Sequence, residues 1–471
     1  MDERGNQRAG RQPSQAAAES WLGHRIEVRI EAIAHGGHCV ARHDGRVIFV
    51  RHTLPGETVL AEVTEDRGGS FCRADAVEIR AAAPDRVRRP CPYAHPGGCG
   101  GCDFQHVSLP GQRGLKATVV AEQLSRLAGL QWPVTVQPLD DGNGLGWRRR
   151  VRFAVGPAGE LGLRAHRSHH VVPLSHCPIG APGVGDARAL QSDWPGLAEL
   201  EVAVDDRGEV VELAHRQRPA RQGRGGDRRG GDGRGRRGGD RRPARPMLTT
   251  EQLSGPLALQ YAVAGRRFTV HPAGFWQTHP RAAEVFTETV LRAAAPRPGE
   301  RVLDLYAGSG LFTAALASAV TGTGRVLGIE AEATAVADAG ANLADQPWAG
   351  VRRATVSAQT VAAAAAELSS DALDEPAGGV DIVVLDPPRS GAGREVLTAI
   401  LAAEPRVVVY VACDPSALAR DVRIAMEAGW RLDELSAFDA FPMTHHVECI
   451  AILRPGPSEG ADVTPETARH K

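Results

Sequence analysis

The residues best suited to chemistry are a cysteine and a glutamate near the end of the chain. Cys413 lies in "YVACDPSALARDV", directly after an apolar run and before a segment that reads as a helix. Asp414 and Pro415 fit the N-cap and first position of that helix, a setting that can lower the pKa of a thiol. Glu448 lies in "THHVECIAIL", which reads as a late strand. A thiol and a carboxylate can serve as nucleophile and general base.

Methylation of a uracil ring is a reaction that needs such a pair. Carbon 5 of uracil is a poor nucleophile, but a thiolate that adds to carbon 6 turns the ring into an enolate that is nucleophilic there. After methyl transfer, a base must remove the carbon 5 proton so that elimination can release the thiol. Cys413 would be the nucleophile and Glu448 the base. A core thiol and an exposed strand residue are the alternative interpretations.

A ligand site is indicated by "LDLYAGSGLFTAALA", which reads as strand, glycine-rich turn and helix. Asp304 ends the strand, and Gly308 and Gly310 let a ligand approach the backbone closely. Glu330 ends the next strand, where a carboxylate can accept both hydroxyls of a ribose. The acidic residue before the turn, with Thr313 in place of a third glycine, disfavours a dinucleotide and suits S-adenosylmethionine. An ordinary strand–turn–helix corner is the alternative.

A third apolar strand ends in "LDPPRSG", which places Asp386 and Arg389 at the same edge of the expected sheet. Amino-group methylases carry an aromatic residue at the position of Arg389, and cytosine-carbon methylases of RNA carry a cysteine there. The arginine therefore disfavours both of these classes. We expect Arg389 to contact the substrate.

Four further cysteines form a candidate metal site: Cys91, Cys99, Cys102 and Cys177. Three closely spaced thiols and one distant thiol can hold an iron–sulfur cubane, and the same four ligands can hold a structural zinc ion. Spacing alone does not separate the two. We do not expect a disulfide framework, because disulfides are rare in cytoplasmic proteins of this length. Cys39, Cys72 and Cys449 are expected to be core thiols.

These residues must be positioned by a chain of 471 residues with a formal net charge of −1. Short alternating strands in residues 21–81 predict a small β-barrel, and residues 82–215 a central α+β domain with the four cysteines. Residues 247–455 alternate apolar strands with alanine-rich helices, which predicts an α/β, Rossmann-like domain. Residues 216–246 are an Arg/Gly-rich insert, and residues 1–20 and 456–471 complete the segments expected to be disordered.

Arginine clusters suggest an RNA partner. "RVRRP" (86–90) and "WRRRVRF" (147–153) could attract phosphates and stack on bases, although a solvated strand face is the alternative for each. The Arg/Gly-rich insert could bind RNA loosely or be a linker. No apolar run is long enough to span a membrane, and the polar N-terminus lacks a signal core, so we expect a cytoplasmic protein. Nothing implies a protein partner, and we expect a monomer.

The ordered motifs together resemble those of the RNA (uracil-C5) methyltransferases with an N-terminal TRAM barrel. They are "GFWQTHPRAAEVF", "DLYAGSGLF", "LDPPRSG", "VACDPSALARD" and "HHVECIAIL", and the resemblance spans residues 21–455 without the insert. It is strongest to the bacterial ribosomal-RNA branch that carries an iron–sulfur cluster. The resemblance implies 5-methyluridine formation in 23S ribosomal RNA or transfer RNA, and a four-iron four-sulfur cluster on the four cysteines.

The resemblance also implies residue roles. Cys413 is the nucleophile, Glu448 the base, and Phe275 stacks on the flipped uracil. The methyl donor or target base is contacted by Gln277, Tyr306, Glu330 and Asp386. His279 replaces an asparagine of the family pattern, and Asp414 adds a carboxylate beside the thiol that tends to raise its pKa. A non-catalytic RNA-binding or ribosome-assembly protein with a methyltransferase fold is the alternative function, which the intact Cys413 and Glu448 disfavour.

Overall fold

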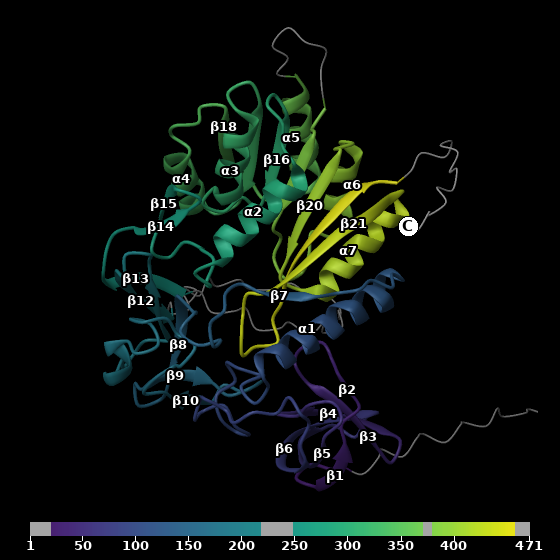
Figure 1. Ribbon diagram of the computed structural model, residues 1–471. Helices are drawn as coiled ribbons and strands as arrows, with labels where there is room; N and C mark the ends of the chain where they lie inside the picture. The colour runs from purple at the N-terminus through teal and green to yellow at the C-terminus, as the bar shows by residue number, and fades with distance from the viewer. Residues whose placement is uncertain (1–19, 218–247, 371–378, 457–471) are drawn as a thin grey trace, which may run out of the picture. The chain divides into compact units, whose positions relative to one another are not determined.

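The computed structural model describes residues 20–217, 248–370 and 379–456 (Figure 1). The chain divides into an N-terminal unit, residues 1–87, and a C-terminal unit, residues 88–471. The segments expected to be disordered lie outside the described residues, apart from a few flanking positions. Arg216 and Gln217, expected at the start of the insert, complete a strand instead. Within the described ranges, no helix is both long and apolar enough to cross a membrane.

The N-terminal unit is a six-stranded sheet in the order β1-β5-β6-β4-β3-β2. In β5 the first six residues alternate between half-buried and buried. Asp66 is paired with Arg46 at 2.5 Å, and Glu57 with Arg86 at 2.5 Å. The strands are β1 (Arg25–Arg29), β2 (Ala32–Ile33), β3 (Cys39–His43), β4 (Arg46–Arg51), β5 (Thr58–Asp66) and β6 (Phe71–Ala81).

The first part of the C-terminal unit contains helix α1 and a second six-stranded sheet in the order β10-β9-β8-β11-β12-β13. Helix α1 (Leu109–Gln123) begins at Ser108, whose hydroxyl accepts a bond from the Gly111 N–H, and it continues into the π-helical turn η1 (Leu124–Ala128). The strands and the short 3-10 turn are β8 (Arg150–Val155), β9 (Leu161–Arg164), β10 (Val171–Pro173), η2 (Arg188–Gln191), β11 (Glu199–Val204), β12 (Val210–Gln217) and β13 (Leu248–Ser254).

The largest sheet has eight strands in the order β18-β17-β16-β19-β20-β22-β21-β7. Five neighbouring strands, β18 to β20 in that order, run parallel, β22 is antiparallel to both of its neighbours, and β7 joins at the edge. The strands are β7 (Val136–Pro138), β16 (Arg301–Leu305), β17 (Arg325–Glu330), β18 (Ala349–Arg353), β19 (Ile382–Leu385), β20 (Val407–Ala412), β21 (Trp430–Asp439) and β22 (Glu448–Pro455). The hairpin β14 (Leu259–Val263) and β15 (Arg266–Val270) precedes β16.

Helices cover both faces of this sheet, and each face has its own apolar core. Helices α2 and α3 pack on one face, whereas α5, α6, α7 and α1 pack on the other, which explains why the central strands β19 and β20 are apolar along their whole length. The helices are α2 (Ala282–Ala294), α3 (Leu311–Val320), α4 (Ala333–Asn342), α5 (Ala358–Ser370), α6 (Arg394–Ala402) and α7 (Pro415–Glu427). Because parallel strands end at one edge, the turns after β16, β17, β19 and β20 gather the candidate residues there.

Candidate active site

Cys413 and Glu448 are brought together by neighbouring strands. Cys413 follows β20 directly, and the register pairs Ala412 with Cys449 on the antiparallel strand β22. The next residues outward, Cys413 and Glu448, therefore lie beside each other although 35 positions separate them in the sequence. Helix α7 begins after Cys413 as expected, since the Asp414 carboxylate accepts a bond from the Ala417 N–H at 2.8 Å.

The thiol of Cys413 has a raised pKa, contrary to the expectation from its helix N-terminus. Burial, together with the carboxyl groups of Glu448 and Asp386, raises the pKa of Cys413 to about 11, although Arg389 acts in the opposite direction. Desolvation and two nearby carboxyl groups outweigh the helix dipole, which contributes only a fraction of a charge. The expected carboxylate effect is therefore present, but it comes from Glu448 and Asp386. The resting thiol is protonated at neutral pH.

The surroundings of Glu448 and Asp386 disfavour the ionised form of both carboxyl groups. Glu448 is 5% exposed, and burial together with Asp386 raises its pKa well above the usual value, with Arg389 acting in the opposite direction. Burial and the buried Asp304 raise the pKa of Asp386 to about 7. A carboxylate with a raised pKa is a stronger base, which is the property that proton abstraction from a carbon requires.

Arg389 is the cation of this group. It is exposed, it lies 3.2 Å from the Nε2 atom of His446, and its charge lowers the pKa of both Cys413 and Glu448. The structure thus places Arg389 beside Cys413 and Glu448, where a guanidinium can stabilise an oxyanion that forms on a substrate ring.

The glycine-rich turn after β16 has the backbone conformation of a close ligand approach. Gly308 has φ 55° and Gly310 φ 86°, and nothing lies within 4 Å of the position that a Gly308 side chain would occupy. Tyr306 has φ 63°, a strained conformation for a bulky residue and one that clusters at functional sites. Glu330 accepts bonds from the N–H groups of Gly308 (3.0 Å) and Glu332 (2.8 Å). Each oxygen keeps a lone pair for a further donor.

Asp304 lies beneath this turn rather than at its surface. It is 1% exposed, and the Thr313 hydroxyl donates to it at 2.5 Å. Burial raises the pKa of Asp304 to about 7, although the bonds from Thr313 oppose that shift. Thr313, which replaces the third glycine of a dinucleotide motif, therefore holds the buried carboxyl group in place.

Two expected ligand contacts lie on the loop between β15 and α2. Phe275 is 66% exposed, which is high for a phenylalanine, and Gln277 is half-buried. Trp276 between them packs against the ring of Tyr261 with ring centres 4.7 Å apart. His279, which replaces the family's asparagine, is buried against Trp147, and burial lowers its pKa to about 4.

The four candidate metal ligands line one cavity in the C-terminal unit: Cys91, Cys99, Cys102 and Cys177. Burial raises the pKa of Cys99 to about 11, and the three other thiols are shifted in the same direction by burial. N–H groups of Gly101 and Gln105 donate to Cys99 and Cys102 at 3.3 and 3.4 Å. Such bonds stabilise ligating thiolates. As the described residues stand, no three His, Cys, Asp or Glu side chains are grouped to hold a metal ion.

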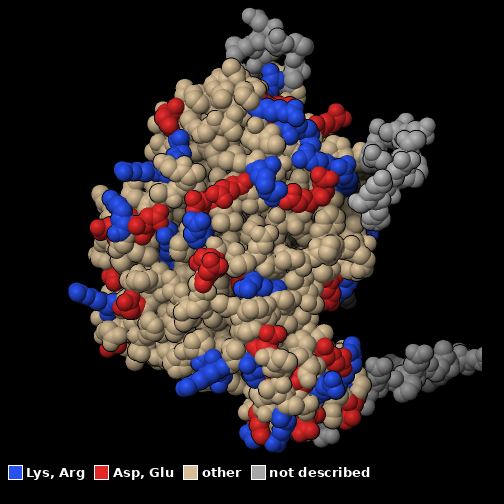
Figure 2. Space-filling view, in the orientation of Figure 1, with Lys and Arg blue, Asp and Glu red and all other residues tan. Residues whose placement is uncertain are grey.

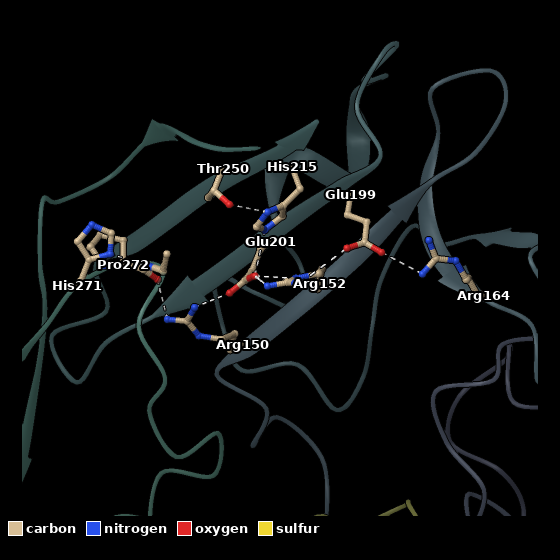
Figure 3. A network of polar contacts seen from close by, with 10 residues as sticks. Arg150, Arg152, Arg164, Glu199, Glu201, His215, Thr250, His271 and Pro272 are labelled. Carbon is tan, nitrogen blue, oxygen red and sulfur yellow. Dashed lines mark hydrogen bonds and ion pairs between the residues drawn. The ribbon is translucent and has the colours of Figure 1, made fainter. Parts of the chain in front are cut away.

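Arginines of the cluster "WRRRVRF" are engaged by an acidic residue (Figure 3). Glu201 on β11 binds both Arg150 and Arg152 of β8, the latter with Nε at 2.8 Å, and His215 lies 3.2 Å away. Burial alone would raise the pKa of Glu201, but the two guanidinium groups outweigh it and lower the pKa. On the face shown in Figure 2, arginines are likewise interspersed with acidic side chains. This supports the strand-face interpretation of "WRRRVRF" over an RNA-binding patch.

The residues that bind the loop 440–447 just before Glu448 were not predicted from the sequence. They are Asp103, Gln112 and Lys116, more than 300 positions earlier in the chain. One signal was available, because Lys116 is one of only two lysines in a chain whose other cations are arginines.

Family models match two parts of the chain. The model described as TRAM domain matches residues 19–77, and the model described as tRNA (Uracil-5-)-methyltransferase matches residues 254–455. An uncharacterized RNA methyltransferase of Streptomyces avermitilis is 43% identical over 446 residues, covering 92% of this chain and 99% of the relative. The 23S rRNA (uracil(1939)-C(5))-methyltransferase RlmD of Shewanella baltica is 31% identical, covering 92% and 96%.

A solved structure shares the fold. The tRNA (uracil-54, C5)-methyltransferase of Pyrococcus abyssi, in complex with S-adenosyl-L-homocysteine, aligns with a TM-score of 0.62. The alignment covers 91% of this chain and all of that one at 21% identity. With the relatives above, which match nearly the whole length, these similarities show that the chain is an enzyme of the RNA (uracil-C5) methyltransferase family, with an N-terminal TRAM domain.

Proposed function

We propose that the enzyme methylates carbon 5 of a uridine in 23S ribosomal RNA, with S-adenosylmethionine as donor and a covalent adduct on Cys413. One observation carries the mechanism: a thiol and a basic buried carboxyl group lie beside each other at the sheet edge where the glycine turn also ends. The 31% identity to the 23S ribosomal RNA enzyme favours that substrate over transfer RNA.

The residues of the turn fit the methyl donor. Glu330 has free lone pairs for ribose hydroxyls, and the open space at Gly308 admits a ligand to the backbone, whereas Gly310 lies against Ala339. S-adenosylmethionine supplies an electrophilic methyl group on a cationic sulfur. Asp386 favours a positive charge at this edge. Tyr306 and Gln277 are the further proposed contacts, and Phe275 offers an exposed ring on which a flipped uracil can stack.

The proposed reaction conserves protons and electron pairs. Cys413 gives its proton to solvent, its sulfur forms a bond to carbon 6, and the ring electrons move to the carbonyl oxygen beside Arg389. Carbon 5 takes the methyl group, and the donor sulfur keeps the electron pair of the broken bond. Glu448 removes the carbon 5 proton, the double bond re-forms, and Cys413 leaves as thiolate. One proton is released in the overall reaction.

The four cysteines are proposed to hold a four-iron four-sulfur cluster in a structural role, since methyl transfer requires no redox step. The support is that all four thiols line one buried cavity with N–H donors beside two of them. Protein purified without oxygen should contain about four irons and four acid-labile sulfides per chain. About one zinc and no sulfide would instead establish the structural zinc site.

The function is tested by nucleoside mass spectrometry of RNA from cells that lack the gene. We expect 5-methyluridine to disappear from purified 23S ribosomal RNA and to return with the wild-type gene but not with the Cys413→Ala variant. Loss from transfer RNA instead would correct the substrate. If the Cys413→Ala protein restores the modification, the covalent mechanism is wrong.

A further inference from the structure

The loop 440–447 joins β21 to β22 and delivers Glu448 to the active site. We propose that helix α1 and the segment after Cys102 fix this loop, and that Lys116, Gln112 and Asp103 are thereby positioning residues for proton abstraction by Glu448. The inference rests on the proposed function, because it assigns these residues to one step of that reaction. In Figure 1 the loop runs from the ends of β21 and β22 toward α1.

Lys116 binds the beginning of the loop. Its side chain is 1% exposed, and its Nζ atom lies 2.5 Å from Asp439 Oδ1 and 3.1 Å from the carbonyl oxygen of Phe441. The chain contains 55 lysines and arginines, and only Lys116 and Lys471 are lysines. An arginine would bring a larger planar group with five donors to the place where Lys116 binds two acceptors, Asp439 Oδ1 and the Phe441 carbonyl oxygen. The site therefore suits the compact ammonium group of a lysine, although the chain otherwise uses arginine almost throughout.

Gln112 binds the middle of the loop from the same helix. Its Oε1 atom accepts a bond from the Met443 N–H at 2.7 Å, and its Nε2 atom donates to the carbonyl oxygens of Phe104 and Val107 at 3.2 and 2.9 Å. Met443 has φ 67°, so this turn is strained for a residue other than glycine and needs outside contacts to persist. One buried amide thus ties the strained turn to the segment that follows Cys102.

Asp103 binds the end of the loop nearest to Glu448. Its N–H and that of Phe104 both donate to the Met443 carbonyl oxygen, at 3.1 and 2.9 Å. The Asp103 carboxylate lies 2.6 Å from the Nδ1 atom of His445. His446, the next residue, contacts Arg389. The contacts therefore continue from the cysteine segment to the active-site arginine and end two residues before Glu448.

The two catalytic side chains depend on different supports. Cys413 is held by β20 and by the cap of α7, neither of which includes the loop. Glu448 is the first residue of β22 and follows the loop directly. Loosening the loop should therefore slow proton abstraction more than adduct formation and methyl transfer, which the loop reaches through the contact between His446 and Arg389. A displacement of about 1 Å can cost roughly a hundredfold in rate.

The test compares the covalent RNA–protein adduct with the released product on ordinary uridine RNA, using a labelled methyl group. The reference is Glu448→Gln, in which the methylated adduct should persist because the base is absent. The test variants are Lys116→Met combined with Asp439→Asn, which leaves no unpaired buried charge from this ion pair, and His445→Ala, which removes a half-exposed ring. The control is Arg292→Met, which breaks an exposed ion pair between Arg292 of α2 and Glu434 of the same strand β21.

We expect the adduct-to-product ratio to rise about tenfold or more in both test variants and less than about twofold in the control. The KM for S-adenosylmethionine should stay within about twofold of wild type, a separation that general unfolding would not produce. If Glu448→Gln accumulates adduct but neither test variant does, the positioning inference is wrong. If Glu448→Gln also accumulates none, the proposed mechanism itself fails. His445→Ala carries the test should the double variant not fold.

Discussion

Two buried glutamates in the C-terminal unit differ in what surrounds their carboxyl groups. Glu201 lies between Arg150 and Arg152, and these cations lower its pKa despite burial. Glu448 is buried to a similar degree, but a second acidic group, Asp386, adds to the effect of burial, and its pKa rises with only Arg389 in opposition. The presence of cationic partners, rather than the degree of burial, therefore decides whether the pKa of a buried carboxyl group is lowered, as in an ion pair that stabilises the fold, or raised, as in a group suited to proton transfer.

The contrast also explains the choice of partner at each place. Glu201 ties two strands of one sheet together, and a weakly basic carboxylate is suited to that purpose because it stays ionised. Under the proposed mechanism Glu448 accepts a proton from carbon and returns it to solvent in each turnover, so a fixed ion pair would deprive it of basicity. Arg389 is exposed, so a substrate can bind it and change its effect on the pKa of Glu448.

The largest expected effect of the contrast is on turnover. Glu448→Gln should lower the rate of 5-methyluridine formation by about 10²- to 10⁴-fold, because it removes the general base. Glu201→Gln should change that rate less than about threefold when assayed well below its unfolding temperature. Both rates are measured by methyl transfer to 23S ribosomal RNA transcripts. Equal losses in the two variants would show that the paired glutamate also takes part in the reaction.

Much of the active site could be predicted from the sequence because its residues follow apolar strands. Cys413 and Asp386 each come directly after such a strand, and parallel strands present their ends at one edge. The helix after Cys413 was also expected from its Asp-Pro cap, which the bond to Ala417 confirms. A raised pKa of Cys413 was expected only from Asp414, since its main causes are burial and Glu448, and Glu448 reaches the site through strand pairing.

Contacts across long stretches of sequence could not be predicted. Arg150 and Arg152 read as a basic cluster, because Glu201 is some fifty positions away and only the register of β8 and β11 brings it opposite. Likewise, β7 joins the edge of the large sheet, and β13 pairs in the sheet of β12, so both cross the domain limits expected at 215 and 247. Such pairings are selected by whole surfaces rather than by a local motif.

A second expected effect is opposite pH dependence of stability. The pKa of Asp386 is about 7 in the folded enzyme, above its unfolded value, so its contribution to stability is lost as pH rises toward and through 7. Asp386→Asn should therefore melt above wild type at about pH 8, with a smaller difference at about pH 5.5. The pKa of Glu201 is lowered by folding, so its contribution is present above the unfolded pKa and lost only in acid.

Glu201→Gln should accordingly melt below wild type at both of those pH values, because both lie above the pKa of an unfolded glutamate. Thermal unfolding of the ligand-free proteins measures all four differences. Two variants that shift the midpoint in the same direction at about pH 8 would contradict the assignment of one paired and one unpaired carboxyl group.

A third expected effect concerns the thiol beside the unpaired carboxyl groups. The pKa of Cys413 is about 11 because of burial and the two carboxyl groups, so only about one thiol in a thousand is ionised at pH 8. A bound sulfonium cation should lower that pKa and increase alkylation of Cys413 by iodoacetamide about tenfold. S-adenosylhomocysteine, which lacks the charge but has nearly the same shape, should not. Equal rates with both ligands would mean that the donor charge does not activate the thiol.

The smallest expected effect is on RNA affinity. Arg152 is already bound by Glu201, with Glu199 nearby, so its charge is largely compensated. Arg152→Gln should therefore change the dissociation constant for RNA less than about twofold and leave its salt dependence unchanged, whereas an arginine that binds a phosphate contributes about one unit to that slope. Arg389→Gln supplies the comparison, because Arg389 is exposed at the active site. If Arg152→Gln reduces the slope as much as Arg389→Gln does, RNA must open the Arg–Glu network on binding, and a paired charge in this protein would then be a functional one.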